Sequence, residues 1–225
     1  MIIELAQNEY PRIWPLVREL AEYNLFIMSV IEGYTPGSIF IDDEINPKTV
    51  FLNTPEGSFL VGDTGNTKFN SSIRELIPDL IDLSVYPNTW EPKIREIIGN
   101  NKFRRYRYRY YTLGEQRIGD WRSRIPCECE FLKITSDFLD RGWENLDQVT
   151  NNIEKKWVSV EEFLKRSFCF IIANRTSILS LCFSDCVIGE RCELGVWTAA
   201  EKRSKGLATL VVAGTVECVR AHCCR

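Results

Sequence analysis

The chain has 225 residues, 44% of them hydrophobic, which is enough apolar material for one large or two small domains with a buried core. Its 28 Lys and Arg residues against 31 Asp and Glu residues give a formal net charge of -3. This balance excludes a global positive field that would draw the chain to nucleic acid or to an anionic membrane. Any anion site must therefore be local.

The first residues, "MIIELAQNEYPRIWPL", lack the basic start, apolar middle and small-residue cleavage site of a secretory signal. No apolar run approaches the length that spans a membrane, so we expect no membrane partner. The nine cysteines are scattered and form no CxxC pair, a usage that suits reduced thiols better than a disulfide framework. We therefore expect a cytoplasmic protein.

The first half of the chain indicates mixed α and β structure. Helical spacing of apolar residues predicts a helix over about residues 11–25, and short apolar runs at 39–41, 48–53 and 57–63 predict an antiparallel meander. Ser71 or Ser72 is the expected cap of a helix that runs to Leu83, with Glu75 as the capping-box partner of Ser72. A short helix at 92–98 and an alternating strand at 102–113 follow.

The second half indicates three strands and a closing helix. Polar residues 135–152 and the helix-like run 159–167 are interpreted as separating two lobes, with the boundary after residue 125. Strand-like runs then cover 168–175, 177–185 and 191–198, and a helix runs from about Gly206 to His222. We expect lobes at 1–125 and 126–225, and periodicity indicates no internal repeat.

Basic residues and a glycine meet at the point where the last helix begins. The preceding strand ends near Thr198, and Arg203, Lys205 and Gly206 lie between it and the helix. The first turn of a helix has N–H groups without partners and a partial positive charge, so this junction suits phosphate oxygens. Gly206 lets a ligand approach without a side chain in the way.

The same junction resembles a known family. Arg203, Gly206 and Ala208 match RxxGxA, the pyrophosphate-binding loop of the GNAT superfamily of N-acyltransferases, and the resemblance extends over residues 193–223. More loosely, residues 29–52 and 57–63 resemble the first lobe of a two-lobed GNAT group typified by the zwittermicin A resistance acetyltransferase. The resemblance implies an α+β fold: a GNAT-like, mainly antiparallel mixed sheet with flanking helices, preceded by a smaller α/β N-terminal lobe.

The resemblance also implies an activity, the transfer of an acetyl group from acetyl-CoA to a small amine without a metal ion. Glu193 is the expected general base; the alternative is a solvated glutamate on a sheet face. The residues expected to bind acetyl-CoA lie at the end of the strand and in the loop after it: Val196, Trp197, Thr198, Arg203, Ser204, Lys205, Gly206, Leu207 and Ala208.

One feature departs from the family pattern. Members continue after this helix with another strand, a helix and two closing strands, whereas this chain stops at "AHCCR". We therefore expect a C-terminally incomplete fold in which the last strand is an exposed edge. The alternative function is a non-catalytic protein that binds acyl-CoA or a protein partner.

Three other patterns have simpler explanations. Arginines and tyrosines alternate over 104–111, which suits single-stranded nucleic acid but also a half-buried strand with arginines on one face, so we expect no nucleic acid. Cys218, His222, Cys223 and Cys224 suggest zinc but also suit a buried helix face, so we expect no metal. Glu32, Asp42 and Asp43 form an acidic rim for a cationic substrate, or simply turns.

The chain contains one histidine, His222, close to its end. Catalysis by a Ser-His-Asp or Cys-His arrangement needs an imidazole that a third group holds in place. The position of His222 argues against both.

Overall fold

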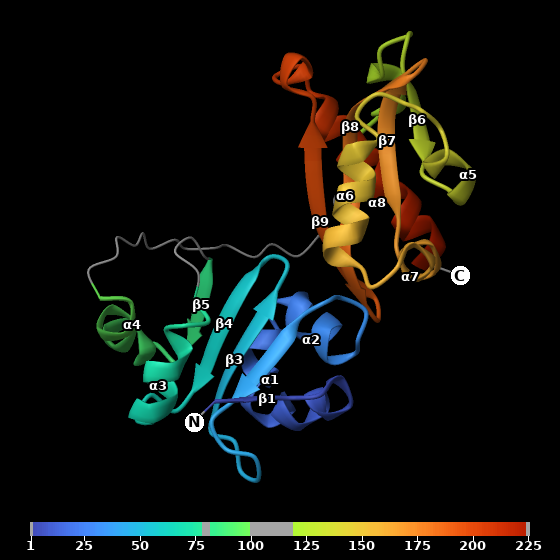
Figure 1. Ribbon diagram of the computed structural model, residues 1–225. Coiled ribbons are helices and arrows are strands. Elements are labelled where there is room, and N and C mark those ends of the chain that lie inside the picture. The colour runs from blue at the N-terminus through green and yellow to red at the C-terminus, as the bar shows by residue number, and fades with distance from the viewer. Residues whose placement is uncertain (1, 78–81, 100–118, 224–225) are drawn as a thin grey trace. The chain divides into compact units, whose positions relative to one another are not determined.

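The computed structural model describes residues 2–77, 82–99 and 119–223, with the side chains of residues 222 and 223 excepted. The chain forms two compact units, residues 1–111 and 112–225 (Figure 1). The boundary expected after residue 125 falls later than this division. The reason is that Trp121 is 4% exposed and packs in the core of the second unit.

The first unit is a five-stranded sheet with helices on both faces (Figure 1). The sheet order is β1-β2-β3-β4-β5, with antiparallel pairs up to β4 and a parallel pair between β4 and β5. The elements in chain order are β1 (Ile3–Glu4), η1 (Gln7–Ile13), α1 (Trp14–Ala21), α2 (Leu25–Ile31), β2 (Ser38–Ile41), β3 (Thr49–Thr54), β4 (Gly57–Gly62), α3 (Thr67–Ile73), β5 (Leu83–Tyr86) and α4 (Trp90–Ile98).

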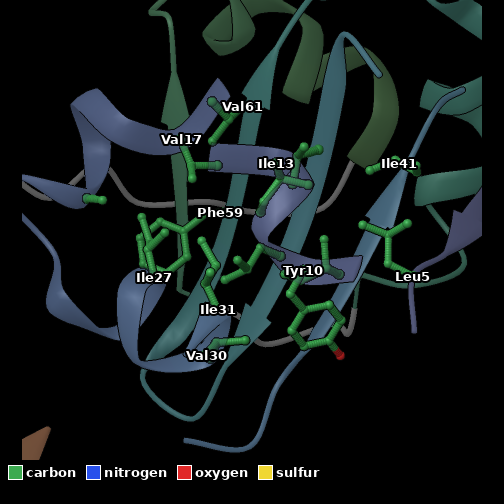
Figure 2. Close-up of a cluster of buried hydrophobic side chains, with 14 residues drawn as sticks. Leu5, Tyr10, Ile13, Val17, Ile27, Val30, Ile31, Ile41, Phe59 and Val61 are labelled. Carbon is green, nitrogen blue, oxygen red and sulfur yellow. The ribbon is translucent and has the colours of Figure 1, made fainter. Parts of the chain in front are cut away.

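Two apolar cores enclose this sheet, one on each face. Val50 and Phe59 belong to the core formed with η1, α1 and α2. Figure 2 shows Phe59 in this core, where Ile13 and Val17 are fully buried. The next residues of the two strands, Phe51 and Leu60, point to the opposite face of the sheet. There they belong to a second buried cluster that includes the fully buried Trp90. Because both faces are covered, the central strands are continuous apolar runs with no polar alternation.

Several expected elements of the first unit differ in the structure. The helix expected over 11–25 is η1 followed by α1, and a second helix, α2, was missed because its sequence "LFIMSVI" is apolar on all sides. The predicted Ser71 or Ser72 cap is wrong: both hydroxyls donate back to carbonyls within α3, and Asn66 is the cap. The meander and the helix at 92–98 are present, and the strand at 102–113 lies outside the described residues.

The second unit is a four-stranded antiparallel sheet in the order β6-β7-β8-β9. Its elements are η2 (Arg122–Arg124), β6 (Glu130–Lys133), α5 (Ser136–Leu139), α6 (Asp147–Lys156), α7 (Val160–Arg166), β7 (Cys169–Asn174), β8 (Ser177–Ile188), β9 (Arg191–Thr198), η3 (Ala200–Lys202) and α8 (Leu207–Cys223). The three strands and closing helix match the expected ones. Residues 135–152, expected to separate two lobes, instead form α5 and α6 of this unit.

The helices of the second unit cover both faces of its sheet (Figure 1). Leu207, Leu210 and Val211 of α8 pack on Ile172, Leu179 and Cys182 of β7 and β8. On the opposite face Phe163 of α7 stacks on Phe183 of β8, with ring centroids 5.0 Å apart and planes 10° from parallel. The apolar packing of α8 fixes the position of its first turn relative to the end of β9.

A clasp joins the start of the second unit to α8. Trp121 Nε1 donates to Glu217 Oε2 at 2.6 Å, and Arg122 Nη1 lies 2.6 Å from Glu217 Oε1. Gly214 lies beneath this clasp: a Cβ at that position would come within 2.6–2.7 Å of Phe131 and Trp121 ring carbons. The absence of a side chain at 214 therefore permits the two rings to pack on the helix.

The two units repeat one order of elements, which periodicity did not indicate. Each begins with a strand, continues through helices into a three-strand antiparallel meander, and then enters a helix after the last meander strand. β1-β2-β3-β4 and α3 of the first unit correspond in this order to β6-β7-β8-β9 and α8 of the second. The repeat was missed because it lies in the topology and not in a periodic sequence signal.

Three thiols lie in the interior of the second unit: Cys169, Cys182 and Cys186. Burial raises the pKa of Cys182 to about 11, and a hydrogen bond with Thr215 offsets part of this effect. Burial also raises the pKa of Cys169 and Cys186. The uncharged thiol is therefore the stable form of each at neutral pH, and none of the three supplies a thiolate nucleophile.

Gly214→Ala is expected to destabilise the protein although alanine is the better helix former. Helix propensity alone predicts a gain of about 1 kcal/mol in the free energy of unfolding. Displacement of the Phe131 and Trp121 rings is expected to cost about 1–3 kcal/mol, so the net change is a loss. Urea unfolding measures it, with Gly142→Ala, where no atom lies within 4 Å of the new Cβ, as the control. A more stable Gly214→Ala protein would contradict the described packing.

The free energy of unfolding is expected to fall between pH 8.5 and 11. The Cys182 pKa is about 11 in the folded state, and a thiol in the unfolded chain titrates near 8.5. Because the pKa is higher in the folded state, the protonated thiol stabilises the fold. This contribution is fully present below about pH 8.5 and is lost as the pH rises towards 11. The loss is about 2–3 kcal/mol. Denaturant titrations in this range measure it, and the fall should be smaller in Cys182→Ala; equal slopes would refute the assignment.

Candidate functional site

The connection between β9 and α8 has an unusual backbone conformation. Ser204 has φ 59° and Gly206 has φ 80°, so two left-handed residues flank Lys205 immediately before the helix. A left-handed serine is strained, whereas Gly206 adopts this φ without cost and no atom lies within 4 Å of the place where its Cβ would be. Such a turn directs successive N–H groups into one concave surface that suits an anion.

The amides of this turn are available to a ligand. Among the described residues, no hydrogen bond is accepted from the backbone N–H groups of 204–209, and the first amide that enters the helical ladder is Leu210 N, which donates to Gly206 O at 3.1 Å. Ser204, Lys205, Gly206, Ala208 and Thr209 are exposed, while Leu207 is buried beneath the turn. The helix therefore begins with a set of exposed donors at its positive end.

Cationic side chains surround these donors. Arg203 and Lys205 are exposed and Lys202 is half-buried; the one acidic residue of the turn is Glu201. Arg203 Nε donates to the carbonyl of Thr198 at 3.2 Å, which anchors the arginine over the end of β9. The expected loop residues Arg203, Ser204, Lys205, Gly206, Leu207 and Ala208 are thus brought together at one helix start. This arrangement favours an anionic group with several oxygens.

β9 presents an open edge next to the turn. It pairs with β8 on one side, and no described strand pairs with it on the other. Because Ala199 N donates to Leu179 O of β8 at 3.0 Å, the alternating ladder directs the peptide groups of Val196 and Thr198 outward. Leu194 and Val196 are 38% and 46% exposed. The Thr198 carbonyl accepts from Arg203 Nε, while the N–H groups of Val196 and Thr198 and the Val196 carbonyl have no partner among the described residues. An extended molecule with amide groups could pair with these groups and cover the apolar surface.

Glu193 and Trp197 lie on one face of β9. Gly195 pairs with Phe183, on which α7 packs, so Gly195 lies on the α7 side of the sheet. Glu193 and Trp197 are two positions away from Gly195 in either direction and therefore face the same side. Val196 pairs with Cys182 and faces the α8 side. Glu193 pairs with Cys186 and is half-buried. After burial, the negative charge of Glu193 is the next cause of the raised pKa of Cys186, which indicates that the carboxylate lies near this thiol.

A buried ion pair lies beside Glu193 that the sequence analysis missed. Lys156 Nζ of α6 lies 2.6 Å from Asp185 Oδ1 of β8. The partners are 29 positions apart in the sequence, so their spacing shows no pattern. The signal was Gly195: a glycine inside a strand often marks a place where another group approaches the backbone closely.

The first unit is an internal comparison for the turn before α8. Its corresponding connection, between β4 and α3, has amides that side chains already occupy: Asp63 Oδ1 accepts from Gly65 N at 2.9 Å and Asn66 Oδ1 from Phe69 N at 3.1 Å. Asp63 also supplies a negative charge where the second unit has arginine and lysine. β5 pairs with β4 along the edge that corresponds to the open edge of β9. Of the two connections, the one before α8 is therefore the candidate anion site.

The other candidate sites of the sequence have different outcomes. Asp42 and Asp43 accept backbone N–H groups of their own turn, and these bonds lower the pKa of Asp43, which supports the turn interpretation. The Arg and Tyr residues of 104–111 lie outside the described residues, as do the side chains of His222 and Cys223 and all of Cys224. Within the described parts of the chain no three His, Cys, Asp or Glu side chains are placed to hold a metal ion.

No helix in the described ranges is long and apolar enough to cross a bilayer.

Comparisons with known proteins agree on one family. The family model of GNAT acetyltransferases matches residues 16–223. An uncharacterized N-acetyltransferase of Bacillus subtilis (strain 168), YdfB, is 25% identical over 197 residues, which is 83% of this chain and 72% of the relative. The crystal structure of a GCN5-related N-acetyltransferase-like protein from Streptococcus suis 89/1591 is similar in fold. Its TM-score is 0.65 at 19% identity, covering 95% of this chain and 85% of that one.

The family model covers both units and includes β9, the turn before α8 and most of α8 itself. The structural neighbour confirms the expected mixed sheet with flanking helices. With the free amides and basic side chains at the start of α8, these matches show that the chain belongs to the GNAT acetyltransferase family.

Proposed function

We propose that the protein transfers an acetyl group from acetyl-CoA to a small amine. The observation that carries this proposal is the set of N–H groups at 204–209, which have no partner in the described part of the chain and lie beside Arg203 and Lys205. A diphosphate has enough oxygen acceptors and negative charge for both groups of donors. Family membership makes acetyl-CoA the diphosphate compound to test first.

The pantetheine arm of the coenzyme would extend along β9. Its amides would pair with the outward carbonyl of Val196 and the outward N–H of Thr198, as a peptide pairs with a sheet edge. Trp197 would contribute through its backbone, which joins these two residues, while its side chain faces the α7 side of β9. In this arrangement the loop binds the diphosphate and the strand directs the thioester towards Glu193.

The acceptor amine would then attack the thioester carbonyl. The carbonyl oxygen gains negative charge, which the outward N–H of Val196 would stabilise. The C–S bond breaks, coenzyme A leaves as a thiolate, and Glu193 accepts the proton that the amine loses. The sequence of steps needs neither a metal ion nor a cysteine nucleophile.

We also propose a cytoplasmic location. The seven cysteines described are all free thiols, at positions 127, 129, 169, 182, 186, 192 and 218. A reducing compartment maintains such thiols.

Gly206→Glu is expected to weaken acetyl-CoA binding at least tenfold, because its carboxylate would repel the diphosphate and its side chain would fill the open side of the turn. Isothermal titration calorimetry measures the dissociation constant. Gly189→Glu is a matched control, since Gly189 also has a positive φ, 58°, and open space around its Cβ position. Equal affinity in the two variants would refute the loop assignment.

Glu193→Gln is expected to lower kcat for acetyl transfer by about 10²- to 10⁴-fold while the acetyl-CoA affinity stays unchanged, because glutamine does not accept the proton. Release of coenzyme A, followed with a thiol reagent over a set of polyamines, amino sugars and amino acids, measures the rate. Glu190→Gln, at an exposed position in the β8–β9 turn, is the control. A full rate in Glu193→Gln would exclude Glu193 as the base.

A further inference from the structure

The Lys156–Asp185 pair is buried more deeply than an ordinary surface ion pair. Lys156 is 6% exposed and Asp185 is 8% exposed, and their charged atoms are 2.6 Å apart. Lys156 is the last residue of α6, and Asp185 lies inside β8. The pair therefore connects the end of a helix to the middle of the sheet through a short contact.

Asp185 occupies an irregular position of β8. Ser184 pairs with Leu194 and Cys186 pairs with Glu193, so Asp185 is an extra residue that has no partner in the β8–β9 register. Such a bulge bends a strand and changes the direction of neighbouring side chains. Here it lies beside Glu193 and near Val196, whose peptide groups face outward.

The carboxylate of Asp185 lies over the backbone of β9. A Cβ at Gly195 would be 2.7 Å from Asp185 Oδ1 and 2.8 Å from Oδ2, closer than real contacts allow. The side chain of Asp185 therefore rests on the strand between Glu193 and Val196. Three elements, α6, β8 and β9, meet at this one contact.

Stability alone does not account for such a pair. Removing two charges from water is expensive, and a buried ion pair is often no more stabilising than apolar side chains of similar volume. Buried ionic groups are better explained where a fixed geometry is required, and β9 carries the outward peptide groups of the proposed acyl-arm site. A strand edge held in place before binding lowers the cost of ordering it when the ligand arrives.

We propose that Lys156 and Asp185 are positioning residues that hold the β9 edge in the arrangement that receives the pantetheine arm and thioester of the acyl donor. This inference rests on the proposed function. The diphosphate contacts of 203–208 do not depend on the ion pair, because that turn is held by α8 and by the contact of Arg203 with Thr198. The two halves of the coenzyme are therefore expected to respond differently when the pair is broken.

Two ligands separate the halves: acetyl-CoA, and adenosine 3′-phosphate 5′-diphosphate, which has the nucleotide and diphosphate but no pantetheine arm. Calorimetry gives the ratio of their dissociation constants for each protein. In the double variant Lys156→Met/Asp185→Asn, both charges are removed at nearly constant volume, which preserves the fold better than either single change. The affinity for the nucleotide fragment is expected to stay unchanged. The affinity for acetyl-CoA, expressed relative to that for the fragment, is expected to fall about tenfold.

A second variant tests the geometry with the charges intact. Gly195→Ala places a methyl group against the Asp185 carboxylate and forces the strand and the side chain apart. It is expected to reduce the advantage of acetyl-CoA in the same way. Arg166→Met is the control: it removes the Arg166–Glu162 pair, which has the same 2.6 Å separation but lies on the surface of α7, and it should change neither affinity.

The outcomes are distinct. If the parent protein binds neither ligand, the proposed function fails and this inference fails with it. If the parent binds both ligands and the double variant keeps the full advantage of acetyl-CoA, the positioning role is wrong while the proposed function stands. If a folded double variant loses affinity for both ligands to the same extent, the pair supports the whole unit and does not position the β9 edge, which also overturns the proposal.

Discussion

The packing of α8 on β7 and β8 determines where the candidate site of this protein is located. Leu207, Leu210 and Val211 are buried against the sheet, so the first turn of the helix lies at the end of β9. A helix start presents N–H donors wherever it occurs, but here apolar packing places those donors beside a free strand edge. Without that packing, the loop and the strand would be two unrelated features.

The two units show how the same order of elements serves different ends. In the first unit, Asp63 and Asn66 occupy the amides of the connection into α3, and β5 completes the sheet beside β4. In the second unit, the amides of the connection into α8 have no partner among the described residues, and cations replace the aspartate. A few side chains in this connection thus distinguish the repeat that holds the candidate anion site from the repeat whose amides are bonded within the chain.

The sequence predicted most of what depends on local patterns. Alternating or continuous apolar runs located the meanders of both units. The glycine and basic residues before Leu207 indicated the candidate anion site, which stays a prediction. α2 was missed because a helix buried on all sides has no amphipathic period, and α6 was taken for a connection because its buried positions are few among polar residues. The Lys156–Asp185 contact needs the register of β8 and β9, which no local pattern contains.

The start of α8 links stability to ligand binding. Asn66 caps α3 from within the chain, and losing such a cap typically costs about 1 kcal/mol. Within the described ranges no side chain accepts from the first amides of α8, and under the proposed function a bound ligand would occupy them. A bound polyanion would accept hydrogen bonds from the first amides of α8 and would stabilise the folded second unit. The melting temperature of this unit would therefore rise with ligand concentration, whereas the corresponding amides of the first unit are bonded within the chain.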